Sequence, residues 1–161
     1  MIRATEPSKS PFIDERYDPL IISAMPARFE DLELDRFLAR HEWLLDRGKR
    51  YATITDLSGL VGLPEAATRR RIADWNNGIE ARARRYTIAT AVIAPNSLLR
   101  GAMTALHWLS PPPYPQAIVA DSAAAIDALD DFYRKSGEPA PDVLAIYRAD
   151  LRRSPRARAG A

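Results

Sequence analysis

The chain has 161 residues, no cysteine and a formal net charge of +2 at pH 7. That length suits one domain, and a hydrophobic share of 47% is enough for a core. The missing cysteines exclude disulfides, thiolate metal sites and cysteine nucleophiles. No apolar run is long enough for a membrane span, and the first residues lack the apolar centre of a secretory signal, so we expect a cytoplasmic protein.

The N-terminal half alternates between strand and helix patterns. Apolar runs at 11–13 and 20–25 predict two short strands joined by a turn. Apolar residues three and four apart over 29–47 predict an amphipathic helix, with Arg40 among its polar positions. The β-branched and aromatic residues at 51–57 predict the next strand.

A second helix is predicted over 64–85, and Asn-Asn-Gly at 76–78 predicts that it kinks there or divides into two shorter helices. The apolar run at 86–94 predicts a strand buried on both faces. Either Asn96 or Ser97 can cap the helix that follows. The apolar residues of that helix are Leu99, Met103, Leu106 and Leu109.

The last third begins with a proline-rich stretch, 110–115, which predicts an extended connector. A short strand is predicted at 116–120. Asp121 then caps a helix that ends near Gly137. A final amphipathic piece at 143–151 is predicted to dock on the body.

Together these elements predict an α/β fold. Strands alternating with helices indicate a small, mostly parallel sheet of four or five strands, with right-handed crossovers and helices on both faces. We expect a disordered N-terminal segment at 1–10 and an α/β domain at 11–136. A docking helix at 137–151 and a basic disordered tail at 152–161 complete the predicted organisation.

Polar side chains follow two of the predicted strands where those strands end. Asp56 and Ser58 come after one strand, and Asn96, Ser97 and Arg100 come after another. In open α/β sheets ligands gather at this edge, and an arginine at a helix start suits a phosphate or carboxylate. The alternative interpretation is structural, with caps, a strand end and a solvated arginine.

The sequence carries no convincing catalytic or metal-binding set. His41 and His107 have no metal-ligand spacing, so we expect no metal site and no cofactor. Ser58, His107 and Asp56 can be drawn as a triad, but no nucleophile elbow accompanies them. We therefore predict that the protein is not an enzyme.

Two features concern macromolecular partners. The segment 148–161 holds five arginines against one aspartate, which predicts either a solubilising terminus or, as the weaker hypothesis, nucleic-acid binding. Trp43, Trp75 and Trp108 each lie in a predicted helix, where they either pack in the core or supply an exposed docking patch. The arginines of the predicted basic tail are Arg152, Arg153, Arg156 and Arg158.

The order of the predicted elements, with the segment Asp56-Leu57-Ser58-Gly59, resembles the STAS domain, the fold of bacterial anti-sigma-factor antagonists. The resemblance covers about residues 11–136. It implies a STAS-like fold and a non-enzymatic switch or scaffold that binds protein partners, sometimes under the control of phosphorylation.

The regulatory serine of that family lies in an Asp-Ser-Ser-Gly motif at the start of the helix after this strand. Here the stretch 62–68 reads Gly-Leu-Pro-Glu-Ala-Ala-Thr and holds no serine. Ser58 and Thr68 are therefore the candidate phosphorylation residues.

The leading hypothesis is a non-catalytic, STAS-like interaction module of a bacterial cytoplasm, bound to another protein or to further copies of itself. The alternative is a small-molecule or nucleotide-binding protein that uses the polar edge of the sheet.

Overall fold

The strands form one sheet in which spatial order follows chain order. The computed structural model describes residues 6–154. β1 pairs antiparallel with β2, and each later pair of neighbours is parallel. The prediction of an α/β fold with a mostly parallel sheet is confirmed. The strands are β1 (Ile13–Asp14), β2 (Leu20–Ala24), β3 (Tyr51–Asp56), β4 (Thr87–Ile93) and β5 (Gln116–Val119).

Side chains at the helix ends account for where the helices start and stop. In the first helix the backbone N–H of Glu30 donates to the carboxylate of Glu33 at 3.1 Å. Asn96 and Asp121 cap the third and fourth helices, and Gly137 ends the fourth in the left-handed conformation with a φ of 74°. The helices are α1 (Asp31–Asp46), α2 (Ala66–Tyr86), α3 (Ser97–Leu109), α4 (Ser122–Ser136) and α5 (Val143–Arg153).

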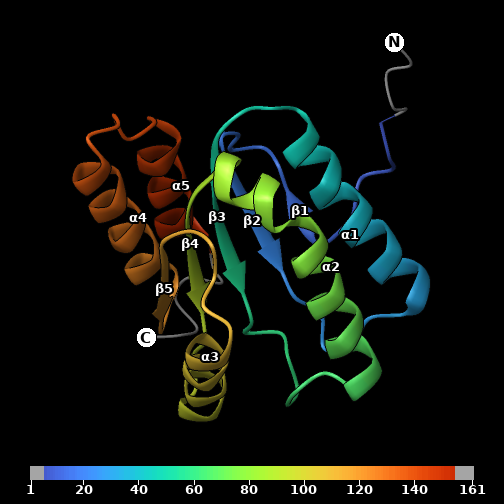
Figure 1. The fold of residues 1–161 in the computed structure, drawn as a ribbon. Coiled ribbons are helices and arrows are strands. Elements are labelled where there is room, and N and C mark those ends of the chain that lie inside the picture. The colour runs from blue at the N-terminus through green and yellow to red at the C-terminus, as the bar shows by residue number, and fades with distance from the viewer. Residues whose placement is uncertain (1–5, 155–161) are drawn as a thin grey trace.

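Helices lie on both faces of the sheet (Figure 1). α1, α2 and α3 each connect one parallel strand to the next. Because strand order follows chain order, crossovers of one hand place all three on the same face. α4 and α5 follow the last strand and cover the other face. In β2, Leu20 and Ile22 accordingly pack with the α4–α5 layer, and Ile21 packs with the α1–α2 layer.

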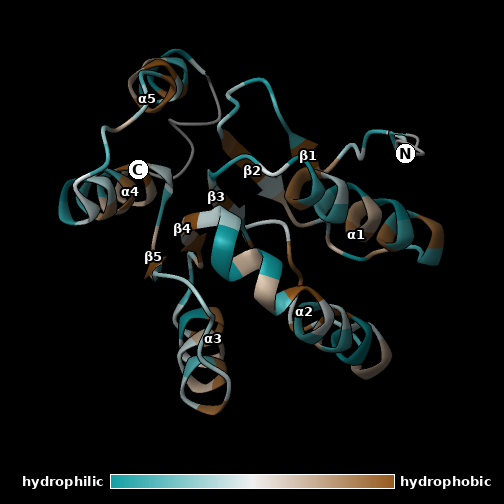
Figure 2. Ribbon diagram, turned by 45° about the horizontal axis from the view of Figure 1, so that its top comes forward, coloured by the Kyte–Doolittle hydropathy of each residue, from teal (hydrophilic) through white to brown (hydrophobic). Residues whose placement is uncertain are grey.

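α2 is one helix from Ala66 to Tyr86, so it does not divide into two shorter helices at 76–78. The predicted alternative of a kink agrees with Figure 2, where the last turns of α2 run in a different direction from its first turns. Trp75 and Ile79, on either side of this stretch, both pack in the core that α1 and α2 share, and Trp75 Nε1 donates to Glu42 at 3.0 Å. Residues 76–78 point to solvent, where their poor helix propensity costs little compared with that packing. α2 also begins two residues after the predicted proline start, at Ala66.

Arg40, which falls among the polar positions of the helix pattern, is only 1% exposed. Its Nε and Nη2 donate to the two carboxylate oxygens of Glu15 at 2.5 and 2.7 Å. Its Nη1 donates to Glu6 at 2.8 Å and to the backbone oxygen of Pro7 at 3.0 Å, and Ser10 is buried. The described part of the segment predicted to be disordered, 6–10, thus has defined contacts; residues 1–5 lie outside the described residues.

α5 packs on the body beside α4. Leu144 is buried in the core that the sheet forms with α4, and the ring of Tyr147 meets the ring of Tyr17 at 4.9 Å. The hydroxyl of Tyr17 donates to Asp150 at 2.8 Å. Of the four arginines of the predicted tail, Arg152 and Arg153 form the exposed last turn of α5, and Arg156 and Arg158 lie outside the described residues.

Candidate functional site

The polar residues predicted to share one edge of the sheet do come to the same edge. β3 and β4 are parallel neighbours, and Asp56 at the end of β3 lies opposite Ile93 at the end of β4. The segments that follow these strands, with Ser58 in one and Asn96 and Ser97 in the other, therefore leave the sheet side by side. Ser58 and Ser97 are both exposed.

Three of these side chains each hydrogen-bond to the protein backbone through one polar atom. Asp56 Oδ1 accepts the backbone N–H of Ser58 at 2.8 Å, which makes a local turn. Asn96 Oδ1 accepts the N–H of Leu99 at 2.9 Å and caps α3. Arg100 Nη1 donates to the backbone oxygens of Ala94 and Pro95 at 3.1 and 3.0 Å. These contacts give Asp56, Asn96 and Arg100 structural roles, and ligand binding at this edge stays a prediction.

Two hollows of the surface lie elsewhere, along α2. One lies between the end of α1 and the end of α2, and the other lies on the outer side of α2. Of the two arginines in the first hollow, Arg82 is paired with Asp46 at 2.6 Å and with Glu42 at 3.3 Å. The residues that line this first hollow are Leu45, Asp46, Ala81, Arg82, Arg85 and Tyr86.

One serine and one histidine are joined in the interior. Ser23 Oγ and His41 Nε2 lie 3.0 Å apart, and the rings of Phe37 and Trp75 flank the imidazole. Burial lowers the pKa of His41 to about 4, against the attraction of Glu15, so the ring is neutral at pH 7. Ser23 is 1% exposed, which bars a substrate from its hydroxyl. The pair therefore holds α1 against β2.

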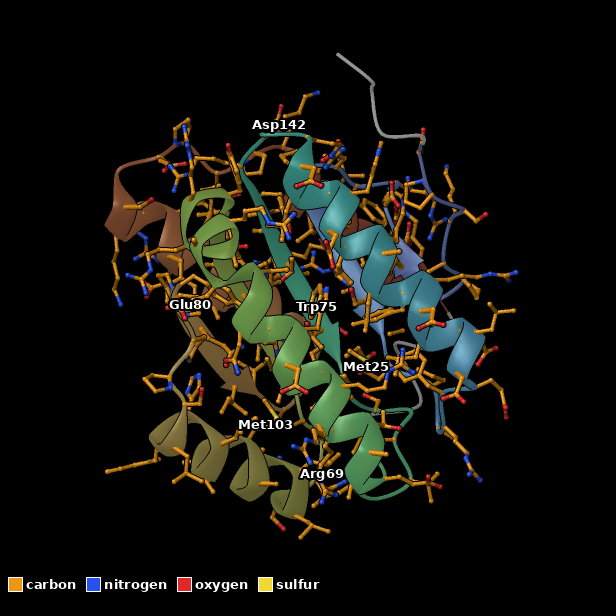
Figure 3. All side chains as sticks on the ribbon, turned by 45° about the vertical axis from the view of Figure 1, so that its right-hand side comes forward. Met25, Arg69, Trp75, Glu80, Met103 and Asp142 are labelled. Carbon is orange, nitrogen blue, oxygen red and sulfur yellow. The ribbon has the colours of Figure 1, made fainter. Side chains whose placement is uncertain are left out.

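Four of the large hydrophobic side chains that are exposed in the described residues lie on α3. This helix buries only Leu99 fully, and Met103 points from it toward the body (Figure 3). Its outward side chains include Trp108 and Leu109, both 85% exposed, and Leu98, 68% exposed. We name as the α3 apolar face the half-buried Ala102 together with the exposed residues Leu98, Gly101, Ala105, Leu106, Trp108 and Leu109.

α3 stands apart from the other helices, beyond the end of β4 and β5 in Figure 1. Figure 2 shows hydrophobic residues both on its sheet side and on its outer side. Two further exposed apolar residues, Val61 and Leu63, lie in the loop between β3 and α2, whose Leu60 packs in the same small core as Met103. This loop and α3 thus share one small core.

Of the three tryptophans, one fits the predicted docking patch. Trp43 packs against the α1–α2 core and stacks with the guanidinium of Arg40 at 4.0 Å, and Trp75 lies between α1 and α2 (Figure 3). Trp108 alone is on the outside. The signal that could have singled it out is the composition of α3, which has Arg100 as its one Lys, Arg, Asp or Glu residue.

The two candidate phosphorylation residues differ in access. Ser58 is exposed in the turn after β3, whereas Thr68 is half-buried in the first turn of α2. The notion that either is modified stays a prediction.

Comparisons with protein-family models, curated proteins and solved structures found no match. Within residues 6–154, the His, Asp and Glu side chains form no group of three or more that could hold a metal ion. In the same range, no helix is both long enough and apolar enough to cross a membrane.

Proposed function

We propose that this chain is a STAS-like, non-catalytic protein-interaction module that acts as a regulatory or scaffold domain in a bacterial cytoplasm. The observation that carries the proposal is the α3 apolar face. Trp108 and Leu109 are among the most exposed hydrophobic side chains of the described residues, and they lie together at the end of one helix. A contiguous apolar patch of this kind on a water-soluble domain marks an interaction site.

The chemistry of the surface suits a protein partner. Tryptophan and leucine bury apolar area on contact, at roughly 25 cal/mol for each Å² removed from water. Aromatic residues also dominate the energetic centres of protein interfaces. The exposed side chains of α3 present little charge or hydrogen-bonding capacity for a small polar ligand.

The arrangement of the sheet also supports the STAS-like part of the proposal. The resemblance implies two N-terminal strand pieces followed by parallel strands that alternate with helices. The structure has an antiparallel β1–β2 pair, three parallel pairings and a closing α4. Ser58, exposed beside the start of the sheet's polar edge, is the residue at which phosphorylation would act in such a module.

The test compares the proteins that co-purify with the full chain and with the variant Trp108→Ser from the native cell, by quantitative mass spectrometry. We expect the variant to lose the specific partners of the wild type, including further copies of the chain itself. The matched control is Ile146→Ser, which removes an exposed apolar side chain from α5. An identical set of partners for wild type and Trp108→Ser would contradict the proposal.

A further inference from the structure

The exposed stripe along α3 reads the same in both directions. Leu98, Ala102, Ala105 and Leu109 follow one another at intervals of four, three and four residues. With 3.6 residues per turn, these intervals place all four along one line of the helix. The line is large, small, small, large from either end. Gly101 and Leu106 flank it, one on each side of its centre.

A pattern that is the same from both ends suits a contact between two copies related by a two-fold axis. In a two-fold dimer the same patch meets itself, so that residue i contacts residue j and residue j contacts residue i. If two α3 helices run antiparallel about such an axis, Leu98 of one copy lies opposite Leu109 of the other. Ala102 then lies opposite Ala105. Small residues at the centre let the two helices approach closely, and the leucines at both ends cover the contact.

The charges do not oppose this pairing. Arg100 is turned back to the backbone oxygens of Ala94 and Pro95, so its guanidinium is held beside its own chain. α3 carries no acidic residue. Antiparallel helices also place the positive end of one helix dipole beside the negative end of the other.

The exposed area is of the size that a weak dimer needs. The four large side chains of the α3 apolar face are between 53% and 85% exposed. Together they offer on the order of 500 Å² per copy, so two copies would bury on the order of 1,000 Å², near the lower limit of specific interfaces.

We infer that a second copy of this chain covers the α3 apolar face, through an antiparallel two-fold pairing of the α3 helices. The inference rests on the proposed function, since it names the partner for the surface identified there. The association is reversible, and the free surface is available to exchange partners.

The first test measures self-association of the full chain by sedimentation velocity from micromolar to near-millimolar concentration. We expect a concentration-dependent dimer, and we expect Ala105→Glu to weaken it at least ten-fold by placing two like charges at the centre of the contact. Ala105 is exposed, so the substitution leaves the monomer fold intact. Thr104→Glu is the matched control, because it adds the same charge one residue away on another exposed side of α3.

The second test fixes the direction of the helices. The chain has no cysteine, so a single introduced thiol reports on one position. We expect Leu98→Cys mixed with Leu109→Cys to form a disulfide between copies under mild oxidation, and neither variant alone to do so efficiently. In the antiparallel arrangement two copies of residue 98 lie about 16 Å apart along the axis, whereas a disulfide needs Cα atoms within about 7 Å.

The outcomes separate this inference from the proposed function. A strictly monomeric chain, or a dimer that Ala105→Glu leaves unchanged, would overturn the pairing through α3. Efficient cross-linking of Leu98→Cys alone would overturn the antiparallel direction. If the chain is monomeric while Trp108→Ser still loses co-purifying proteins, the inference fails and the proposed function stands, with another protein on the α3 apolar face. If Ala105→Glu leaves self-association unchanged and Trp108→Ser loses no partner, both fail.

Discussion

Arg40 is a buried cation whose partners are distant in the sequence, in the β1–β2 turn and the N-terminal segment. The helix pattern assigns it to the polar positions of α1, and no local signal reveals Glu15 as its partner. Breaking a buried ion pair by removing one member costs more than the pair contributes, because the remaining charge is left without compensation. Glu15, with a side chain 17% exposed, is that remaining charge.

We expect Arg40→Met to lower the free energy of unfolding by about 3 kcal/mol in urea titrations. The control is Arg16→Met, since Arg16 is 77% exposed in its pair with Asp14. Exposed pairs contribute less than about 1 kcal/mol, so this variant should unfold almost like the wild type. Equal losses for the two variants would show that Arg40 is not buried as described.

His41 gives the stability a defined dependence on pH. Its pKa in the folded chain is lowered to about 4 by burial, below the ordinary value of 6.5. At a pH between these two pKa values, the imidazole is protonated in the unfolded chain and neutral in the folded chain. The free energy of unfolding therefore falls as the pH drops below about 6.5. The expected slope from this group is roughly 1.4 kcal/mol per pH unit.

The measurement is the free energy of unfolding at pH 7 and pH 5 for wild type and His41→Asn. Other groups also titrate in this window, so the difference between the two proteins isolates the imidazole. We expect the wild type to lose about 2 kcal/mol more than the variant over this interval. Parallel pH dependences would mean that the ring is solvated in the folded chain.

At the scale of elements, type and order could be predicted, because each strand or helix carries its own periodicity and its own end signals. Asn96, Asp121 and Gly137 illustrate this, since each ends or begins a helix through local chemistry. Two outcomes depend on distant contacts that local sequence signals do not contain. α2 continues through 76–78 because Trp75 and Ile79 pack on α1, and α3 turns most of its apolar residues outward because the body offers it little surface.

Two glycines test this difference between local and tertiary control. A Cβ on Gly59 would overlap the backbone oxygen of Met25, well inside van der Waals contact, where the turn after β3 packs on the end of β2. We expect Gly59→Ala to destabilise the protein by about 1–3 kcal/mol. Gly78→Ala places its methyl group in open space on a continuous helix and should stabilise the protein by up to about 1 kcal/mol. Thermal unfolding of both variants shows whether each substitution raises or lowers the stability. Destabilisation by Gly78→Ala would argue for a broken α2.

For the molecule as a whole, the sequence placed the polar edge correctly and missed the α3 apolar face. Parallel neighbours necessarily bring the ends of β3 and β4 together, so Asp56 and Asn96 could be grouped in advance. Whether their polar atoms are free depends on turn and cap geometry. The exposure of α3 depends on how far that helix lies from the sheet. The spacing of apolar residues along α3 does not reveal this, because a buried helix has the same spacing.

The alternative function, a small-molecule or nucleotide binder at the polar edge, has a direct test. A ligand at 100 times its Kd stabilises the folded state by about 2.7 kcal/mol. We expect no such stabilisation from a thermal-shift panel of nucleotides and anionic metabolites, because Asp56, Asn96 and Arg100 already bond to the chain. A shift that Arg100→Gln abolishes and Arg84→Gln retains would instead support the alternative.

The matching of strand order to chain order also decides when the molecule can finish folding during synthesis. All five strands and the three connecting helices have left the ribosome once residue 119 emerges. The side of the sheet that carries Leu20, Ile22 and Ile54 is still bare at that moment, because only 122–153 can cover it. A nascent chain stalled before that segment would expose this apolar face of the sheet to chaperones and to other chains. Residues 122–153 therefore complete the fold by covering that face of the sheet.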